Sequence, residues 1–125
     1  MVVLDAGALV SVERADRDVI AIIKRERLAG RAPITHGGVI GQVWRGGTGR
    51  QANLARLLPG LDVAALDEAF GRRVGMLLAR TKTSDVIDAA VALLASDGDE
   101  ILTTDADDLR VLVRATGAHV DIIVV

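Results

Sequence analysis

Cysteine is absent from this chain of 125 residues, and its absence excludes disulfides, thiolate zinc sites and cysteine nucleophiles. Aromatic residues are almost as scarce, since Trp44 and Phe70 are the only ones. The core must therefore consist of valine, leucine, isoleucine and alanine, and these suffice because 50% of the residues are hydrophobic. Lysine occurs only at Lys24 and Lys82, so most basic side chains are arginines, which suit bidentate contacts with phosphates.

The chain shows neither a strong net charge nor a targeting segment. Its formal charge of −2 gives the whole molecule no general attraction for nucleic acid. The apolar start lacks a basic n-region and is interrupted by Asp5, so it does not resemble a signal peptide. No stretch is long and apolar enough to span a membrane. We therefore expect one cytoplasmic domain over residues 1–125, without membrane contact.

Short apolar strands alternate with helical patterns along the sequence. Strands are predicted over 2–4, 32–35, 61–66, 100–104 and 119–125. Helices are predicted over 16–29, 38–45, 51–60, 67–80, 85–96 and 105–117. The glycine-rich stretch 46–50 is expected to be a flexible loop. Short β-branched strands of this kind are typical of a parallel sheet covered on both faces. The sequence therefore predicts an α/β fold, a three-layer α/β/α sandwich with a mainly parallel central sheet.

Acidic residues follow two of the predicted strands directly. Asp5 comes after the first strand and Asp105 after the fourth. Because ligands bind outside the carboxyl ends of parallel strands, both acids should lie at the functional edge. Asp108 follows Asp105 by one helical turn and can point the same way. Asp88 lies in an otherwise apolar helix, where an ionised carboxylate needs a counter-charge.

These acids have structural as well as chemical interpretations. Asp85 is expected to cap its helix, and Asp105 can be either a helix cap or a ligand. If Asp5, Asp88 and Asp105 converge on one edge, they shift each other's pKa unless a cation holds them. Mg²⁺ prefers such all-oxygen surroundings, and metal–carboxylate sites orient phosphates and activate water for hydrolysis.

The segments that carry these acids resemble the acidic motifs of PIN-domain ribonucleases, in particular the VapC toxins of bacterial toxin–antitoxin pairs. They are VVLDAGALV at 2–10, SDVIDAAVALLA at 84–95 and ILTTDADDL at 101–109, in the order found in that family. The resemblance implies a Mg²⁺- or Mn²⁺-dependent endoribonuclease with a flavodoxin-like sandwich. It also implies a homodimer that a cognate VapB-like antitoxin inhibits.

The resemblance assigns roles to individual residues. Asp5, Asp88 and Asp105 match the first, third and fourth acids of the family. Asp108 matches a further acid present in many members, so all four are candidate metal ligands. Thr103 matches the hydroxyl residue often found two positions before the fourth acid and is a candidate for substrate contact.

The second acid of the family is missing. Members usually have a glutamate in the helix after the second strand, followed closely by an arginine. Arg45 is retained as a candidate substrate contact, but Gln42 stands where the glutamate is expected. Glutamine is isosteric with glutamate but cannot act as a base, although its carbonyl can coordinate a cation or orient a water. Gln42 can therefore belong to an active site with weaker metal binding, mark an attenuated or inactive protein that binds RNA or an antitoxin, or lie away from the site.

Other polar residues have weaker functional interpretations. Glu13 or Asp16 could restore the lost charge, although both are expected to be surface or capping residues. His36 is expected to be a satisfied or solvated histidine. Three arginines can either form a basic strip that holds an RNA backbone or remain solvated on helix faces. They are Arg45, Arg50 and Arg56.

Overall fold

Five parallel strands form one sheet in the computed structural model, which describes all 125 residues. The strands are β1 (Val2–Leu4), β2 (Ile34–His36), β3 (Asp62–Ala64), β4 (Glu100–Thr103) and β5 (Asp121–Val124). They lie in the order β3-β2-β1-β4-β5, and every neighbouring pair is parallel. The direction of strand succession reverses between β1 and β4. Such a switch point is where open parallel sheets bind ligands, outside the carboxyl ends of the strands.

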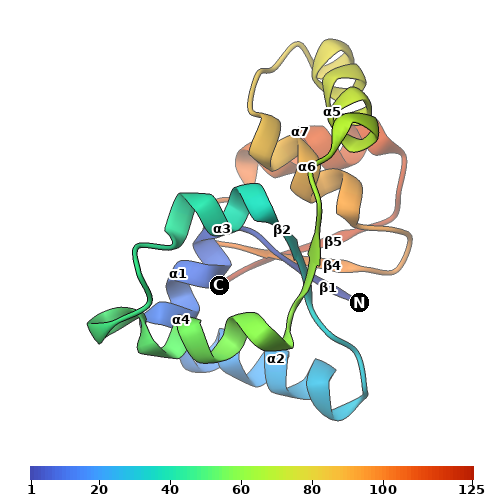
Figure 1. The fold of residues 1–125 in the computed structure, drawn as a ribbon. Helices are drawn as coiled ribbons and strands as arrows, with labels where there is room; N and C mark the ends of the chain where they lie inside the picture. Colours follow the sequence, from blue (N-terminus) through green and yellow to red (C-terminus); the bar gives the residue numbers. More distant parts are fainter.

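Helices cover both faces of this sheet (Figure 1). They are α1 (Ala6–Glu13), α2 (Arg17–Leu28), α3 (Gly37–Val43), α4 (Ala52–Leu57), α5 (Glu68–Thr81), α6 (Val86–Leu94) and α7 (Asp107–Thr116), with 3₁₀ turns at Gly49–Gln51 and Leu58–Gly60. On one face α1 packs against β1 and β4 and is surrounded by α2, α3 and α4. On the other face α6 packs against β1 and β2 and contacts α5 and α7. The predicted α/β/α sandwich is confirmed, with a sheet that is wholly parallel.

The predicted elements occur within two residues of their expected ends, with one division and one omission. The helix expected over 51–60 is α4 followed by a 3₁₀ turn at Leu58–Gly60, because Pro59 cannot continue the hydrogen-bonding pattern. Helix α1 was not predicted. Its residues Ala8, Leu9, Ser11 and Val12 are all buried, so the segment lacks the polar face that marks an amphipathic helix.

The core is aliphatic, as the composition requires. Its centre contains Leu4 and Ile101 from neighbouring strands and a run of small residues in α6, and all of these are inaccessible to solvent. The small residues at 89–92 let α6 approach the sheet closely. Trp44 and Phe70 are only partly buried and pack against the border of the core.

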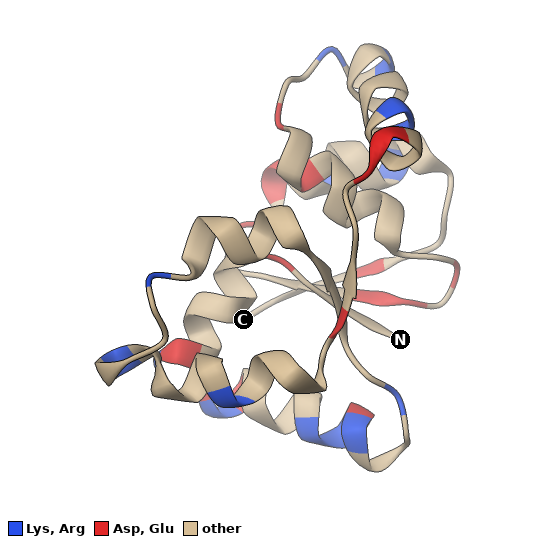
Figure 2. Cartoon of the chain, viewed as in Figure 1, with Lys and Arg blue, Asp and Glu red and all other residues tan.

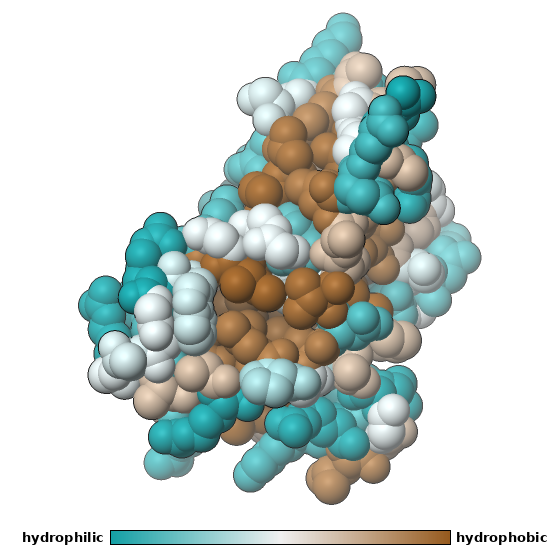
Figure 3. All heavy atoms as spheres, in the orientation of Figure 1, coloured by the Kyte–Doolittle hydropathy of each residue, from teal (hydrophilic) through white to brown (hydrophobic).

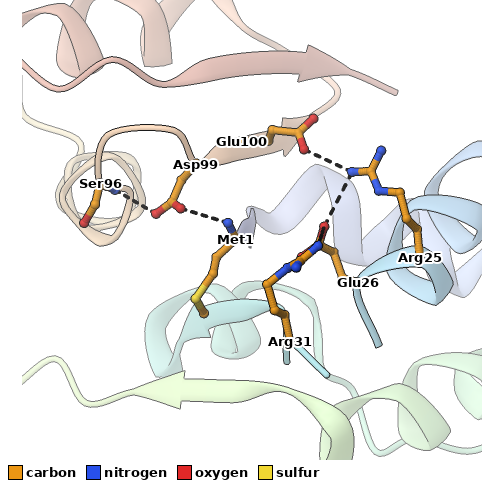
Figure 4. A network of polar contacts seen from close by, with 7 residues as sticks. All are labelled: Met1, Arg25, Glu26, Arg31, Ser96, Asp99 and Glu100. Carbon is orange, nitrogen blue, oxygen red and sulfur yellow. Dashed lines mark hydrogen bonds and ion pairs between the residues drawn. The ribbon is translucent and has the colours of Figure 1, made fainter. Parts of the chain in front are cut away.

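Acids at the amino-terminal edge of the sheet have cationic partners (Figure 4). Buried Glu26 accepts hydrogen bonds from Nε and Nη2 of Arg31 at 2.7 and 3.2 Å, and these bonds hold the pKa of Glu26 below its usual value. Arg25 donates to Glu100 at 3.0 Å, at the start of β4. The N-terminal amino group contacts Asp99 at 2.9 Å. This end of the sheet therefore contains balanced pairs of charges.

One face of the molecule carries an apolar patch. Figure 3 shows hydrophobic residues gathered between α3 and α4, beside the edge strand β3. Val63 of that strand is exposed. No helix has the length and apolar character needed to cross a membrane.

Candidate active site

The turn from β1 to α1 places Asp5 at the carboxyl edge of the sheet. Asp5 is the N-cap of α1, and its Oδ1 accepts the Ala8 N–H at 2.9 Å. Its own N–H donates to the carbonyl of Leu102 in β4 at 3.3 Å. Burial raises the pKa of the Asp5 carboxyl, while the N–H groups of Ala8 and Gly7 partly offset that rise. Asp5 is thus a fixed, largely desolvated carboxylate beside β4.

The turn after β4 brings Asp105 to the same edge. Buried Thr103 holds this turn, because its Oγ1 donates to the Asp105 carbonyl and accepts the Asp105 N–H, both at 3.0 Å. Asp105 is exposed, and its Oδ1 accepts the Asp107 N–H at 3.3 Å, but the N-cap position of α7 belongs to Ala106. Thr103 therefore positions the backbone that carries Asp105.

The two turns approach closely at Gly7. A Cβ at Gly7 would collide with the Thr104 hydroxyl and lie 3.0 Å from the Thr104 nitrogen. We expect Gly7→Ala to lower the free energy of unfolding by about 1–3 kcal/mol, as overpacking does, measured by urea denaturation. Gly75→Ala, in α5 with open space around it, is the matched control and should raise stability by up to about 1 kcal/mol. Wild-type stability in the Gly7→Ala protein would contradict this close approach.

Asp88 joins these acids from the first turn of α6. Asp85 caps that helix as expected, and its Oδ1 accepts the Asp88 N–H at 2.9 Å. Burial, followed by the negative charges of Asp85, Asp5, Asp108 and Asp105, raises the pKa of Asp88 to about 6. In Figure 2 the acidic segments at the starts of α6 and α7 lie on the same side of the molecule. Together with burial, the charges of the acids predicted from the sequence therefore raise the pKa of Asp88 at this edge of the sheet.

None of these carboxylates forms an ion pair. The ion pairs of the molecule involve other acids, namely Glu26, Glu68, Asp99, Glu100 and Asp107. Neighbouring like charges without a counter-charge disfavour the ionised form and destabilise the folded protein. The carboxyl edge thus differs from the paired amino-terminal edge, and a bound cation would relieve its repulsion.

The carboxylates at this edge fit a hard divalent cation that the protein coordinates only in part, with water molecules as its other ligands. All the donors are carboxylate oxygens, the ligands that Mg²⁺ and Mn²⁺ prefer. No three acidic or histidine side chains are placed together as a ready ligand set for one ion. Mg²⁺ typically binds one or two carboxylates and keeps several waters. The residues therefore fit an open, partly hydrated site and do not fit a closed cage.

Gln42 lies in α3, on the face that approaches the start of α6. It is exposed and makes no side-chain hydrogen bond, whereas the adjacent Val43 is buried. Gly38, one turn earlier, is so close to Ile87 that a Cβ would collide with the Ile87 side chain. Helical side chains lean over the preceding turn, so we expect Gln42 to lean over Gly38, the residue that lies against Ile87. No direct contact joins Gln42 to the acids.

His36 has a structural role at the end of β2. It is wholly inaccessible to solvent, and its Nδ1 accepts the Gly38 N–H at 3.1 Å. The ring proton is thereby assigned to Nε2, which donates to the Ile87 carbonyl at 3.1 Å. Burial lowers the pKa of His36 and keeps the ring neutral. The expectation of a satisfied histidine is confirmed.

Arg45 and the two acids near α1 lie apart from the cluster. The Nη1 atom of Arg45 donates to the Gly41 and Trp44 carbonyls at 3.1 and 2.6 Å, at the end of α3. Asp16 caps α2, and Glu13 accepts a hydrogen bond from the side chain of Gln51. Neither acid replaces the charge missing at Gln42. Sequence reasoning missed Gln51, because no periodic pattern or motif marks its bonds to the end of α3 and to Glu13, which is 38 positions away.

The fold and its unpaired acidic edge define a doubly covered parallel α/β protein with a group of acids at the switch point of the sheet. No model of a known protein family matches the chain, and no curated protein sequence matches it. Its fold is similar to that of a chain in the crystal structure of VapBC2 from Rickettsia felis, bound to a DNA fragment from their promoter. The TM-score is 0.71, with 98% of this chain and 99% of that chain covered, at 12% identity. At this identity the likeness establishes a shared fold.

Proposed function

We propose that the protein is a metal-dependent endoribonuclease, the cytoplasmic toxin of a VapBC-type toxin–antitoxin pair. The observation that carries the proposal is the set of unpaired carboxylates of Asp5, Asp88 and Asp105 at the switch point of the sheet. The PIN-type motifs around these acids support the nuclease assignment. The shared fold with a chain of the VapBC2 complex supports the toxin assignment.

Asp5, Asp88 and Asp105, with Asp108, would line the site of a Mg²⁺ or Mn²⁺ ion, one or two of them as direct ligands and the others through the waters that the ion keeps. When bound, such an ion orients a phosphate and lowers the pKa of a water for in-line hydrolysis. Asp5 needs little reorganisation, because the N-cap bond fixes its carboxylate. Burial and the neighbouring acids raise the pKa of Asp88 to about 6, and a bound cation would favour its ionised form. Gln42 can orient the water through its amide but cannot take its proton.

The antitoxin would occupy a groove between α1, α2 and α4 with a volume of about 400 Å³. Its apolar lining includes Val12, Ile20, Ile23 and Leu57, and its basic residues are Lys24, Arg27 and Arg56. This combination suits an amphipathic segment with acidic side chains. The apolar patch between α3 and α4 in Figure 3 supports the proposal of a homodimer, because exposed apolar patches mark association surfaces.

Cleavage of a labelled, structured RNA by the purified protein tests the proposal. We expect cleavage with Mg²⁺ or Mn²⁺ and none with excess EDTA. Cleavage that persists in excess EDTA would exclude a metal-dependent mechanism.

A PIN-fold protein that binds RNA or an antitoxin without effective catalysis is the second candidate. Gln42 favours it, because the neutral amide leaves the site with one charge fewer than the family pattern has. This candidate predicts that the RNA is retarded in a gel shift but stays intact with Mg²⁺.

A further inference from the structure

The side chain of Gln51 is buried and uses all four of its hydrogen-bonding positions. Its Oε1 accepts the N–H groups of Arg45 and Gly47 at 2.8 and 3.1 Å. Its Nε2 donates to Glu13 Oε1 at 2.8 Å and to the Val43 carbonyl at 2.9 Å. These partners fix which end of the amide is oxygen. Neither an acid nor an apolar side chain of similar size can reproduce this set of two donated and two accepted bonds.

Gln51 joins segments that are distant along the chain. Glu13 ends α1, and Val43 ends α3. The Val43 carbonyl is one of the last in its helix, where carbonyls lack intrahelical partners. Gln51 therefore caps the end of α3 and ties it to α1, immediately before α4 begins.

The same bonds shape the stretch from Trp44 to Arg50, here termed the arginine loop. Gly47 has a φ of +73°, and its Cα lies so close to the Trp44 ring that a Cβ would collide with it. Only glycine meets both requirements at this position. The stretch that the sequence predicts to be flexible thus folds back on Trp44, and it leaves Arg45 and Arg50 exposed.

We propose that Gln51, held by Glu13, is a positioning residue that fixes the arginine loop and thereby presents Arg45 and Arg50 to the phosphates of RNA. Helix α3 has seven residues and runs from the carboxyl edge of the sheet to this loop. At 1.5 Å per residue, the arginine loop therefore begins roughly 10 Å along α3 from the carboxyl edge of the sheet. Positive charge there offsets the repulsion between the acidic edge and an RNA backbone. The choice of RNA as the ligand rests on the proposed function, whereas the shape of the loop does not.

Trp44 supplies a readout of the loop that does not depend on RNA. It is the only tryptophan, so its emission and its quenching by acrylamide report its packing against Gly47. Gln51→Leu removes all four hydrogen bonds, and Gln51→Glu directs a second carboxylate at Glu13 and the Val43 carbonyl. Glu13→Ala removes one bond and should act in the same direction with a smaller effect. Val113→Ala, a core change in α7, controls for a general loss of stability.

In the folded Gln51 variants we expect red-shifted, more strongly quenched Trp44 emission. We also expect a KM for a short fluorescein-labelled RNA hairpin that is about tenfold higher, as for the loss of one charge-assisted contact, with kcat nearly unchanged. Wild-type Trp44 signals in these variants, or the same changes in Val113→Ala, would overturn the proposal. Altered Trp44 signals with an unchanged KM would show that the arginines are merely solvated. If the wild type neither binds nor cleaves the hairpin, the proposed function fails. The Trp44 signals of the Gln51 variants then still show whether Gln51 fixes the arginine loop.

Discussion

Asp5→Asn is expected to lower the rate of Mg²⁺-dependent RNA cleavage by about 10²- to 10³-fold, because it removes a charge and a ligand from the proposed cation site. The fold should survive, since asparagine also caps helices and can still accept the Ala8 N–H. The raised pKa of Asp5 means that its ionised form is disfavoured in the folded protein. In EDTA at pH 7 the variant should therefore be at least as stable as the wild type.

Asp67→Asn is the matched control for this substitution. Asp67 caps α5 in the same way, with its Oδ1 accepting the Phe70 N–H at 2.9 Å, but it lies outside the acidic cluster. Initial rates of RNA cleavage and urea denaturation in EDTA measure the two effects separately. Asp67→Asn should retain wild-type cleavage. A wild-type rate in Asp5→Asn would refute the assignment of Asp5 as a metal ligand.

Gln42→Glu is expected to strengthen Mg²⁺ binding about tenfold or more, because it adds a carboxylate on the side of α3 that faces the start of α6. Isothermal titration with Mg²⁺ measures the affinity, and RNA cleavage measures its consequence. Asn53→Asp adds the same charge to α4, away from the acids, and should leave both unchanged.

The two measurements together separate the three interpretations of Gln42. Tighter Mg²⁺ binding with faster cleavage indicates that the wild-type site is attenuated. Tighter binding without faster cleavage indicates a site adapted to glutamine. No change in either would show that Gln42 lies outside the site, contrary to the placement inferred from Gly38 and Ile87.

The arrangement of strands and helices could be predicted because it depends on local patterns. Apolar β-branched runs and amphipathic helices repeat along the chain, and glycine marks several of their ends. Helix α1 could not be predicted from periodicity, because it has no polar face to mark it in the sequence. Its packing against β1 and β4 stabilises the helix instead. Its N-cap, Asp5, stands out in the sequence as a candidate site residue, and nothing after it indicates a helix.

Asp5 and Asp105 could also be predicted, because the end of a strand in a parallel sheet implies the functional edge. Asp88 could be predicted because it is an acid in an otherwise apolar helix. Their mutual effect on the pKa of Asp88 supports this placement. The role of Thr103 in holding Asp105, and the bonds of Gln51, were not visible. Thr103 acts on a neighbouring backbone, whereas Gln51 and Glu13 are 38 positions apart, and no local pattern connects them.

The raised pKa of Asp88 sets the direction of the pH dependence. Its ordinary value of 3.8 is raised to about 6 in the folded protein, so folding favours the protonated carboxyl. The stability gained from that proton is fully present below about pH 4 and is lost as the pH rises through about 6. A cation that binds the ionised carboxylate stabilises the protein at pH 7 and has little effect at pH 5.

Thermal unfolding of the wild-type protein in Mg²⁺ and in EDTA, at pH 7 and pH 5, measures whether the carboxylates bind a cation. A ligand that binds only the folded state must stabilise it. At pH 7 Mg²⁺ should raise the unfolding temperature by about 4 °C or more, which corresponds to roughly 1 kcal/mol. At pH 5 the rise should nearly vanish. No rise at pH 7, or equal rises at both pH values, would contradict a cation site formed by Asp5, Asp88 and Asp105.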